Sequence, residues 1–163
     1  TMRQPRTRVA GASHAADALR GQDVVWADTD REQAELVGRP GPLNGVVVLD
    51  ITRVVAGPFC SMLLADLGAT VIKIENPKDP DYTRTFPPFV GEEKSSAFFA
   101  QYNRNKSALT LDMKSERGKA LLKRLVTRAD VLVENFRPGT MDKLGLGYDD
   151  LSKENPRLIY TAI

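Results

Sequence analysis

The basic residues that follow one short apolar run are the side chains of this sequence best suited to hold a phosphate. In the segment Glu134-Asn135-Phe136-Arg137-Pro138-Gly139, Arg137 comes just after the run, and Lys143 lies six residues further on. A guanidinium can bind a phosphate through two hydrogen bonds, and an ammonium can bind it as a point charge. Phe136 could pack beside a base. The same residues could form a solvated basic loop, and composition by itself favours that second interpretation.

A second segment argues against a dinucleotide site. A dinucleotide-binding fold carries G-x-G-x-x-G after its first strand. Here the turn reads Thr52-Arg53-Val54-Val55-Ala56-Gly57-Pro58, with a single glycine. Pro58 has no backbone N–H to donate. Glu75 stands where a ribose-binding acid would lie, but without the glycines it carries little weight, so a nicotinamide or flavin site is disfavoured.

The remaining polar groups specify no reaction by themselves. The segment Leu111-Asp112-Met113-Lys114 follows an apolar run, and Asp112 and Lys114 could bind a ligand or cap the helix that comes next. Asp50 and Asp66 are carboxylates with no evident partner acid.

Composition narrows the classes of protein. The chain has 163 residues, of which 42% are hydrophobic and 27% charged, as in one ordinary globular domain. A formal charge of +2 gives no reason to expect a nucleic-acid partner. Cys60 is the single cysteine and His14 the single histidine, which argues against disulfides, a histidine triad and a zinc or other metal centre. No apolar run approaches the roughly 20 residues that span a bilayer, so no membrane partner is expected.

The apolar pattern predicts strands that alternate with helices. The predicted strands are 46–49, 70–75, 109–111, 131–133 and 158–163; the predicted helices are 59–67, 97–102, 115–128, 141–144 and 149–154; a proline-rich loop covers 76–88. Such alternation predicts a parallel sheet with right-handed crossovers. Ligands of these sheets bind outside the carboxyl ends of the strands. That rule selects segments 52–58, 75–84 and 134–143.

Residues 1–40 are predicted to be an N-terminal extension, disordered or a leader, and residues 41–163 the domain. Residues 1–16 contain three arginines and no acid, which suits either a basic tail or an organellar leader. A short helix is possible over 29–37, and Gly38-Arg39-Pro40-Gly41-Pro42 is typical of a linker. The single cysteine fits a reducing compartment, so we expect a cytoplasmic protein, with the mitochondrion as the alternative.

Ordered blocks of residues cover the chain from position 41 to its end. They are Pro42-Leu43-x-Gly45, Val48-Leu49-Asp50, Ala56-Gly57-Pro58, the run LADLGATVIKIE at 64–75, Asp81-x-x-Arg84, Asn103-Arg104-Asn105-Lys106, the run ADVLVENFRPG at 129–139, Leu144-Gly145 and Asn155-Pro156-Arg157-Leu158-Ile159-Tyr160. In this order and spacing the blocks resemble the N-terminal portion of the class III CoA-transferases (CaiB/BaiF type), the family of formyl-CoA transferase and carnitine CoA-transferase.

The resemblance implies a fold and an activity. The fold would be α/β, a Rossmann-like parallel sheet with flanking helices, incomplete at the C-terminus. The full-length enzyme would move CoA between small carboxylic acids as an interlocked homodimer, with acyl-CoA as substrate and no permanently bound cofactor. An aspartate attacks the thioester, giving an aspartyl anhydride and CoA thiolate. That aspartate is expected beyond Ile163, so this chain is expected to hold no catalytic residue and to be inactive by itself.

The resemblance also implies which residues contact CoA. They are Val55, Ala56, Leu111, Asp112, Met113, Lys114, Asn135, Phe136, Arg137 and Lys143, with Arg137 and Lys143 facing the nucleotide phosphate. Two departures from the family pattern concern this site, since Val55 replaces a polar residue and Asn76 replaces an arginine of some members. The alternatives are an inactive, truncated CoA- or nucleotide-binding module and an NAD-dependent oxidoreductase.

Overall fold

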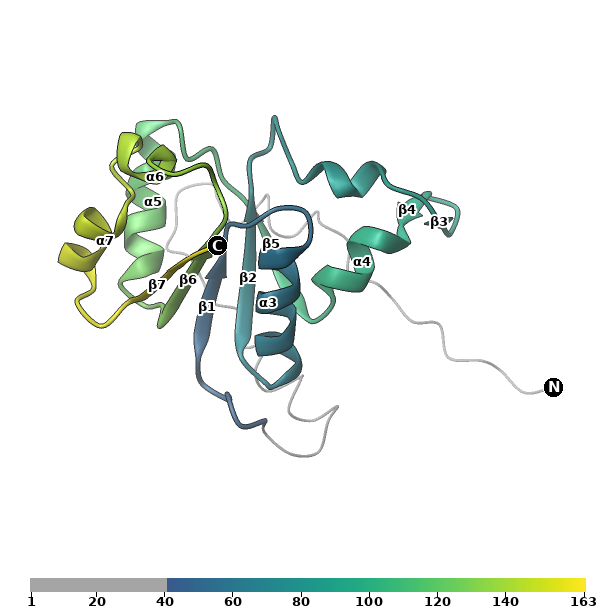
Figure 1. Cartoon of the computed structure of the whole chain (residues 1–163), viewed down its shortest axis with the longest axis horizontal. Helices are drawn as coiled ribbons and strands as arrows, with labels where there is room; N and C mark the ends of the chain where they lie inside the picture. The colour runs from purple at the N-terminus through teal and green to yellow at the C-terminus, as the bar shows by residue number, and fades with distance from the viewer. Residues whose placement is uncertain (1–40) are drawn as a thin grey trace. The chain divides into compact units, whose positions relative to one another are not determined.

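The computed structural model describes residues 41–163, so the predictions for residues 1–40 lie outside the described part. Residues 41–163 form a parallel sheet of five strands, which confirms the predicted fold class (Figure 1). Its strands are β1 (Val47–Asp50), β2 (Thr70–Glu75), β5 (Lys106–Thr110), β6 (Val131–Glu134) and β7 (Ile159–Ala162). Their spatial order is β5-β2-β1-β6-β7.

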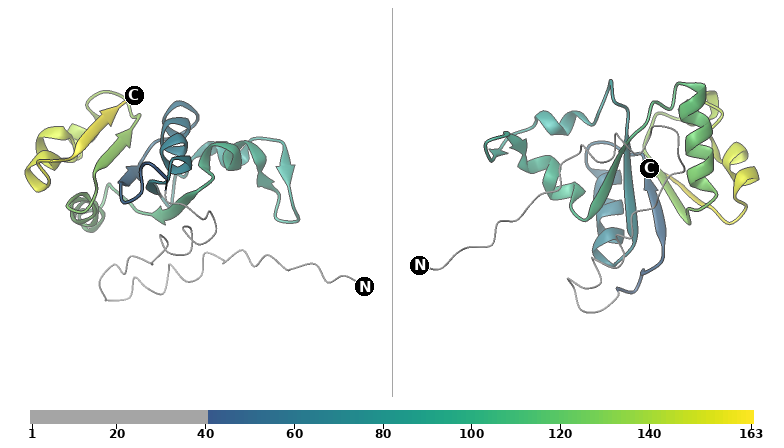
Figure 2. Two further views of the ribbon diagram at one scale, coloured as in Figure 1. Left: turned by 90° about the horizontal axis from the view of Figure 1, so that it is seen from below. Right: turned by 180° about the vertical axis from the view of Figure 1, so that it is seen from behind.

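Helices connect the strands on both faces of the sheet. They are α3 (Ala56–Asp66), α4 (Ala97–Asn103), α5 (Glu116–Val126), α6 (Thr140–Lys143) and α7 (Tyr148–Glu154). The chain moves from β1 to β2 and β5 on one side, then crosses through α5 to β6 and β7 on the other. Because right-handed crossovers in opposite directions use opposite faces, α3 and α5 lie on opposite faces of the sheet (Figure 2).

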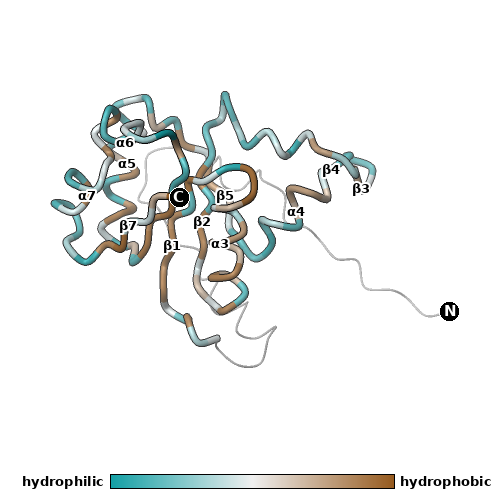
Figure 3. Tube along the Cα trace, in the orientation of Figure 1, coloured by the Kyte–Doolittle hydropathy of each residue, from teal (hydrophilic) through white to brown (hydrophobic). Residues whose placement is uncertain are grey.

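The central strands are apolar on both faces because helices cover both. Val48, Leu49, Val71 and Leu132 are fully or almost fully buried, and apolar residues follow one another along these strands (Figure 3). Continuous apolar runs of this kind are typical of covered parallel sheets. The core therefore lies around β1, β2 and β6 and fixes the loops at their ends.

Two predicted boundaries are wrong for identifiable reasons. The third strand is β5, Lys106–Thr110, so Leu111 lies past its end. Within the described sheet, β5 pairs with β2 on one side only. Its first residues are polar, so a search for apolar runs did not predict where the strand begins. Helix α3 begins at Ala56, three residues before the predicted start, with Pro58 in its first turn. A proline is tolerated there because those N–H groups need no intrahelical partner.

The predicted loop 76–88 contains a 3-10 helix. This helix, η1 (Tyr82–Thr85), is capped by the Asp81 side chain, which accepts the Thr83 N–H. A short hairpin of β3 (Phe89–Val90) and β4 (Ser95–Ser96) follows it. The other helices and strands begin and end within two residues of the predicted positions. None of the helices formed by residues 41–163 has the length and apolar character needed to cross a bilayer.

Candidate functional site

At one point in the sheet, the connections that follow two neighbouring strands run to opposite faces. After β1 the chain enters α3 on one face, and after the adjacent β6 it runs toward α6 and β7 on the other. Open α/β sheets bind their ligands in the crevice at such a switch point, outside the carboxyl ends of the strands. The candidate site therefore lies between the loops that follow β1 and β6.

Three loops meet at this edge of the sheet. Arg53, after β1, is bonded to Asn135 of the loop after β6. Val54 donates its N–H to Asp81 of the loop after β2, at 3.0 Å. The Arg53 guanidinium also pairs with the Asp79 carboxylate at 2.9 Å. The three segments selected from the sequence are thus brought together.

Side chains from other elements hold the backbone of Thr52–Val54, which we call the β1–α3 turn. Asp50 accepts the Thr52 N–H at 2.9 Å, and the Lys73 ammonium donates to the Thr52 carbonyl at 3.0 Å. Asn135 accepts the Arg53 N–H at 2.9 Å and donates to the Arg53 carbonyl at 2.8 Å. With Asp81 on the Val54 N–H, every residue of the turn has a side-chain partner.

A buried charge network, made of Asp50, Lys73, Asp81 and Lys106, underlies this turn. Asp50 and Lys106 are 2.9 Å apart, and Lys73 lies 3.6 Å from Asp81. None of the four side chains is more than 2% exposed. Asp50 also accepts hydrogen bonds from the hydroxyls of Thr52 and Ser61. Among the described residues, no buried side-chain nitrogen or oxygen lacks a hydrogen-bond partner.

The pKa values within the network reflect burial and opposite charge. Burial by itself raises the pKa of Asp50, but Lys73, Lys106 and the two hydroxyls outweigh it, so this pKa lies below its ordinary value of 3.8. Burial lowers the pKa of Lys106 below 10.5, although Asp50 opposes the shift. Asp50 is therefore a fixed anion at neutral pH rather than a proton donor.

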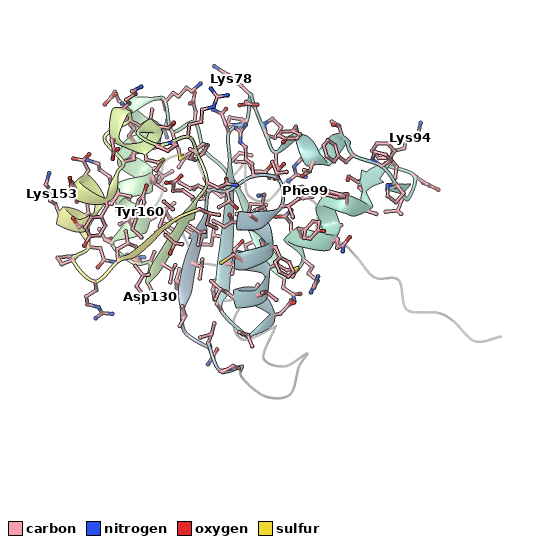
Figure 4. All side chains as sticks on the ribbon, viewed as in Figure 1. Lys78, Lys94, Phe99, Asp130, Lys153 and Tyr160 are labelled. Carbon is pink, nitrogen blue, oxygen red and sulfur yellow. The ribbon has the colours of Figure 1, made fainter. Side chains whose placement is uncertain are left out.

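Glu75 is occupied by protein groups and is not free to bind a ribose. Its carboxylate pairs with Arg84 and accepts the Asp81 N–H at 3.0 Å. Arg84 in turn lies 3.8 Å from the centre of the Phe99 ring, which is labelled in Figure 4. Burial raises the pKa of Glu75, but Arg84, the Asp81 N–H and Lys73 bring it below 4.5. This contact pattern gives Glu75 a structural role in the loop after β2.

Acid is expected to destabilise the domain through Asp50 and Glu75. Their pKa values are lower in the folded chain than the ordinary 3.8 and 4.5, so the unfolded chain binds more protons in this range. Stability therefore rises with pH here, is fully present above the ordinary pKa values, and is lost as pH falls through the lower folded ones. Urea unfolding at pH 7 and in steps down to about pH 3 measures the slope. Glu75→Gln should flatten it, and an unchanged slope would contradict this assignment.

The predicted ligand residues before α5 divide into buried and accessible ones. Leu111 and Met113 are 7% and 8% exposed, so their side chains belong to the core and only their backbone could meet a ligand. Asp112 accepts the Lys114 N–H at 3.0 Å, which makes it the cap of a turn. Lys114 is exposed.

The predicted residues at the switch point also differ in what they offer. Val55 and Ala56 are exposed at the start of α3, whereas the Asn135 amide is committed to Arg53. Phe136 is half-buried and donates its N–H to Glu134 at 2.7 Å. Arg137 and Lys143 are exposed, and neither forms an ion pair with another described residue.

Glu134 also restrains the loop after β6 from the side of β7. Its carboxylate bonds to the hydroxyl of Tyr160, which is labelled in Figure 4. Burial, the nearby charges of Glu134 and Asp142, and this hydrogen bond raise the pKa of Tyr160. The neutral tyrosine is a hydrogen-bond donor that holds the Glu134 carboxylate beneath Phe136.

Sequence reasoning missed the positions that organise the site. Arg53, Lys73 and Asp81 were not predicted as site residues, and Asp50 was predicted to have no evident partner acid. One signal was present, since Lys73 lies inside the mostly apolar run TVIKIE of a predicted strand of the sheet. A buried ammonium requires a partner. Among residues 41–163, no cluster of three or more His, Cys, Asp or Glu side chains could hold a metal.

The fold and the site define a class of protein. Numbered along the sheet's own strands, the order is 3-2-1-4-5, the Rossmann arrangement, with open loops at its switch point. The chain belongs to CoA-transferase family III, whose model matches residues 43–163.

Over the aligned segment, relatives in this family are identical to the chain at close to half of the positions. It is 49% identical over 122 residues to acetyl-CoA:oxalate CoA-transferase of Acetobacter aceti, covering 75% of this chain and 31% of that protein. It is 49% identical over 146 residues to mouse succinyl-CoA:glutarate CoA-transferase, covering 89% and 32%. A solved CaiB/BaiF family protein from Brucella suis superposes with a TM-score of 0.72 at 45% identity, covering 76% and 33%. The chain thus spans about a third of the length of these relatives.

Proposed function

We propose that the loops at the switch point bind CoA and that the longer protein transfers CoA between carboxylic acids. The observation that carries the proposal is the pair Arg137 and Lys143, two exposed cations beside the β6 loop without ion pairs to other described residues. Each is free to meet an anion, and CoA carries three phosphates. Family membership supplies the class of ligand.

Different residues at the carboxyl ends of the strands would contact different parts of CoA. Arg137 and Lys143 would bind the nucleotide phosphate through a bidentate guanidinium and a point charge. Val55 and Ala56, at the start of α3, would meet the ligand along their backbone. Leu111 and Met113 would contribute backbone groups only, because their side chains are buried.

Three described aspartates near the candidate site do not suit the nucleophile of the transfer reaction. Asp50 and Asp81 are buried in ion pairs, and Asp112 accepts the Lys114 N–H. The family resemblance places the nucleophilic aspartate beyond Ile163, and we propose the same for the longer protein. Its carboxylate oxygen attacks the thioester carbonyl, the C–S bond breaks, and CoA leaves as the thiolate. The acceptor carboxylate then displaces the donor acid from the anhydride, and the thiolate attacks the new acyl group, which regenerates the aspartate.

The acids, the assembly and the location are further proposals. Relatives are named for oxalate, glutarate, succinate and mesaconate, so we propose small dicarboxylic acids as the acids exchanged. The family resemblance supports an interlocked homodimer. The single cysteine supports a cytoplasmic location, with the mitochondrion as the alternative.

The test of phosphate recognition is calorimetric titration of the chain with CoA and with dephospho-CoA. Arg137→Ala should weaken CoA about tenfold, the loss of one charge-assisted contact, and dephospho-CoA less than about twofold. Arg128→Ala is the matched control, because it removes another exposed arginine just past the end of α5, on a different loop. That variant should bind both ligands as the unaltered chain does.

Two results would contradict the proposal. Equal weakening of CoA and dephospho-CoA by Arg137→Ala would show that Arg137 acts elsewhere than at the phosphate. Tighter binding of NAD than of CoA would favour the oxidoreductase alternative and overturn the function.

A further inference from the structure

The β1–α3 turn takes its shape from side chains rather than from its own backbone. In the described part of the chain, no backbone–backbone hydrogen bond involves Thr52, Arg53 or Val54. Their N–H groups and two of their carbonyls bind Asp50, Lys73, Asn135 and Asp81. Removing the Asn135 side chain, which is not part of the buried charge network, is therefore expected to free the turn locally and leave the strands paired.

The turn also needs this support because of its backbone conformation. Val54 has φ of 72°, in the left-handed region that a β-branched residue disfavours. Its N–H is held by the buried Asp81 carboxylate, which is in turn fixed by Lys73. Without these contacts Val54 would be expected to relax toward an ordinary conformation.

The turn leads directly into the part of α3 assigned to the ligand. Val55 and Ala56 follow Val54, so the positions of their backbone N–H groups depend on the conformation of the turn. Asn135 begins the loop that carries Arg137, so its two bonds to Arg53 set the separation of the two sides of the switch point. The Asn135 amide group thus links the β1–α3 turn directly to the loop after β6.

We propose that Asn135, supported by Asp81 and Lys73, is a positioning residue that holds the β1–α3 turn and the loop after β6 at the separation that CoA binding requires. In this role it acts through the Arg53 backbone, not by direct contact with the ligand. This inference rests on the proposed function, since it requires that the crevice binds CoA. It gives the Asn135 side chain a positioning role in addition to the CoA contact that the family resemblance implies for this residue.

The test compares Asn135→Ala with Asn155→Ala in the full chain. Asn155 is a matched control because its amide also bonds backbone groups of other segments. It donates to the carbonyls of Val126 and Ala129, which precede β6 rather than follow it, and it accepts the Arg157 N–H. Hydrogen exchange reports the turn, and calorimetry reports CoA affinity at a temperature where thermal unfolding shows both variants folded. Asn135→Asp, which keeps the acceptor for the Arg53 N–H, is the second variant if the alanine variant does not fold.

The expected result has two parts. In Asn135→Ala the Arg53 amide should exchange about 100-fold faster while β1 amides stay protected. CoA affinity should fall at least about tenfold, because the crevice must then be ordered upon binding. Asn155→Ala should leave CoA affinity unchanged, and Asn135→Asp should fall in between.

The failures are distinguishable. If the unaltered chain binds no CoA, the proposed function is overturned and this inference with it. If the unaltered chain binds CoA and Asn135→Ala binds it equally well, the proposed function stands and the positioning role is overturned. Equal losses of affinity in Asn135→Ala and Asn155→Ala would overturn it as well, since the effect would then be one of general stability.

Discussion

Replacing Asp50 with alanine is expected to lower the free energy of unfolding by about 3–5 kcal/mol, the usual cost of breaking a buried ion pair by removing one partner. The substitution leaves Lys106 beside an empty position and takes a counter-charge from Lys73. It also removes the acceptor of the Thr52 and Ser61 hydroxyls. A loss of this size is a large fraction of the stability of an ordinary domain.

Urea unfolding followed by circular dichroism measures this loss. Asp66→Ala is the matched control, since Asp66 also forms an ion pair, with Arg104 at 2.6 Å, but on the surface of α3. Exposed pairs contribute about 1 kcal/mol or less, so the control should remain close to the unaltered chain. Similar losses in the two variants would show that the buried charge network does not support the sheet as described.

The second large effect is expected at Gly118, in the first turn of α5. An alanine inside a helix ordinarily stabilises it relative to glycine by about 1 kcal/mol. Here a Cβ at position 118 would lie 1.9 Å from the Asp112 carbonyl oxygen and 2.7 Å from its carbon. Backbone atoms cannot rotate away as a side chain can, so Gly118→Ala should instead destabilise by about 3 kcal/mol.

Gly145→Ala provides the comparison for Gly118. Gly145 has φ of 69°, and no atom lies within 4 Å of the position that an added Cβ would take, so its variant carries conformational strain without collision. That strain costs about 1–2 kcal/mol. The same unfolding measurement should rank Gly118→Ala as the more damaging, and a stabilised Gly118→Ala would contradict the close approach of α5 to Asp112.

The Gly118 collision also concerns the ligand. Any shift that accommodates an added methyl group moves the Leu111–Lys114 segment, which we propose to contact CoA. Weaker CoA binding is therefore expected from Gly118→Ala, although residue 118 is itself buried.

Much of the fold could be predicted because its signals are local. The run Val46-Val47-Val48-Leu49 and the run TVIKIE predicted strands, and the helix predicted from position 115 begins after Ser115, which caps it by accepting the Gly118 N–H. Alternation of such elements predicted the parallel sheet, and the carboxyl-end rule selected the three segments that meet there. The edge strand β5 was misplaced because its exposed, polar residues lack the apolar pattern of a covered strand.

The roles of individual side chains at the site depended on contacts across the sequence. Leu111 and Met113 lie in a predicted ligand segment, yet the packing of α5 buries their side chains. Asn135 lies in another predicted ligand segment, and its amide bonds a residue 82 positions away. Arg137 and Lys143 lie exposed near the crevice, and their contact with phosphate stays a prediction until the calorimetry is done.

The sequence by itself determined the alternating strands and helices, the family and the edge of the sheet where we propose that a ligand binds, because periodicity, motif order and strand ends are properties of neighbouring residues. The tertiary structure decided which charges neutralise one another. Asp50 and Lys106 are 56 positions apart in the sequence, and the sheet brings them together although β2 lies between their strands. Pairing of this kind follows from strand order and burial, since an unpaired charge could not remain in that interior.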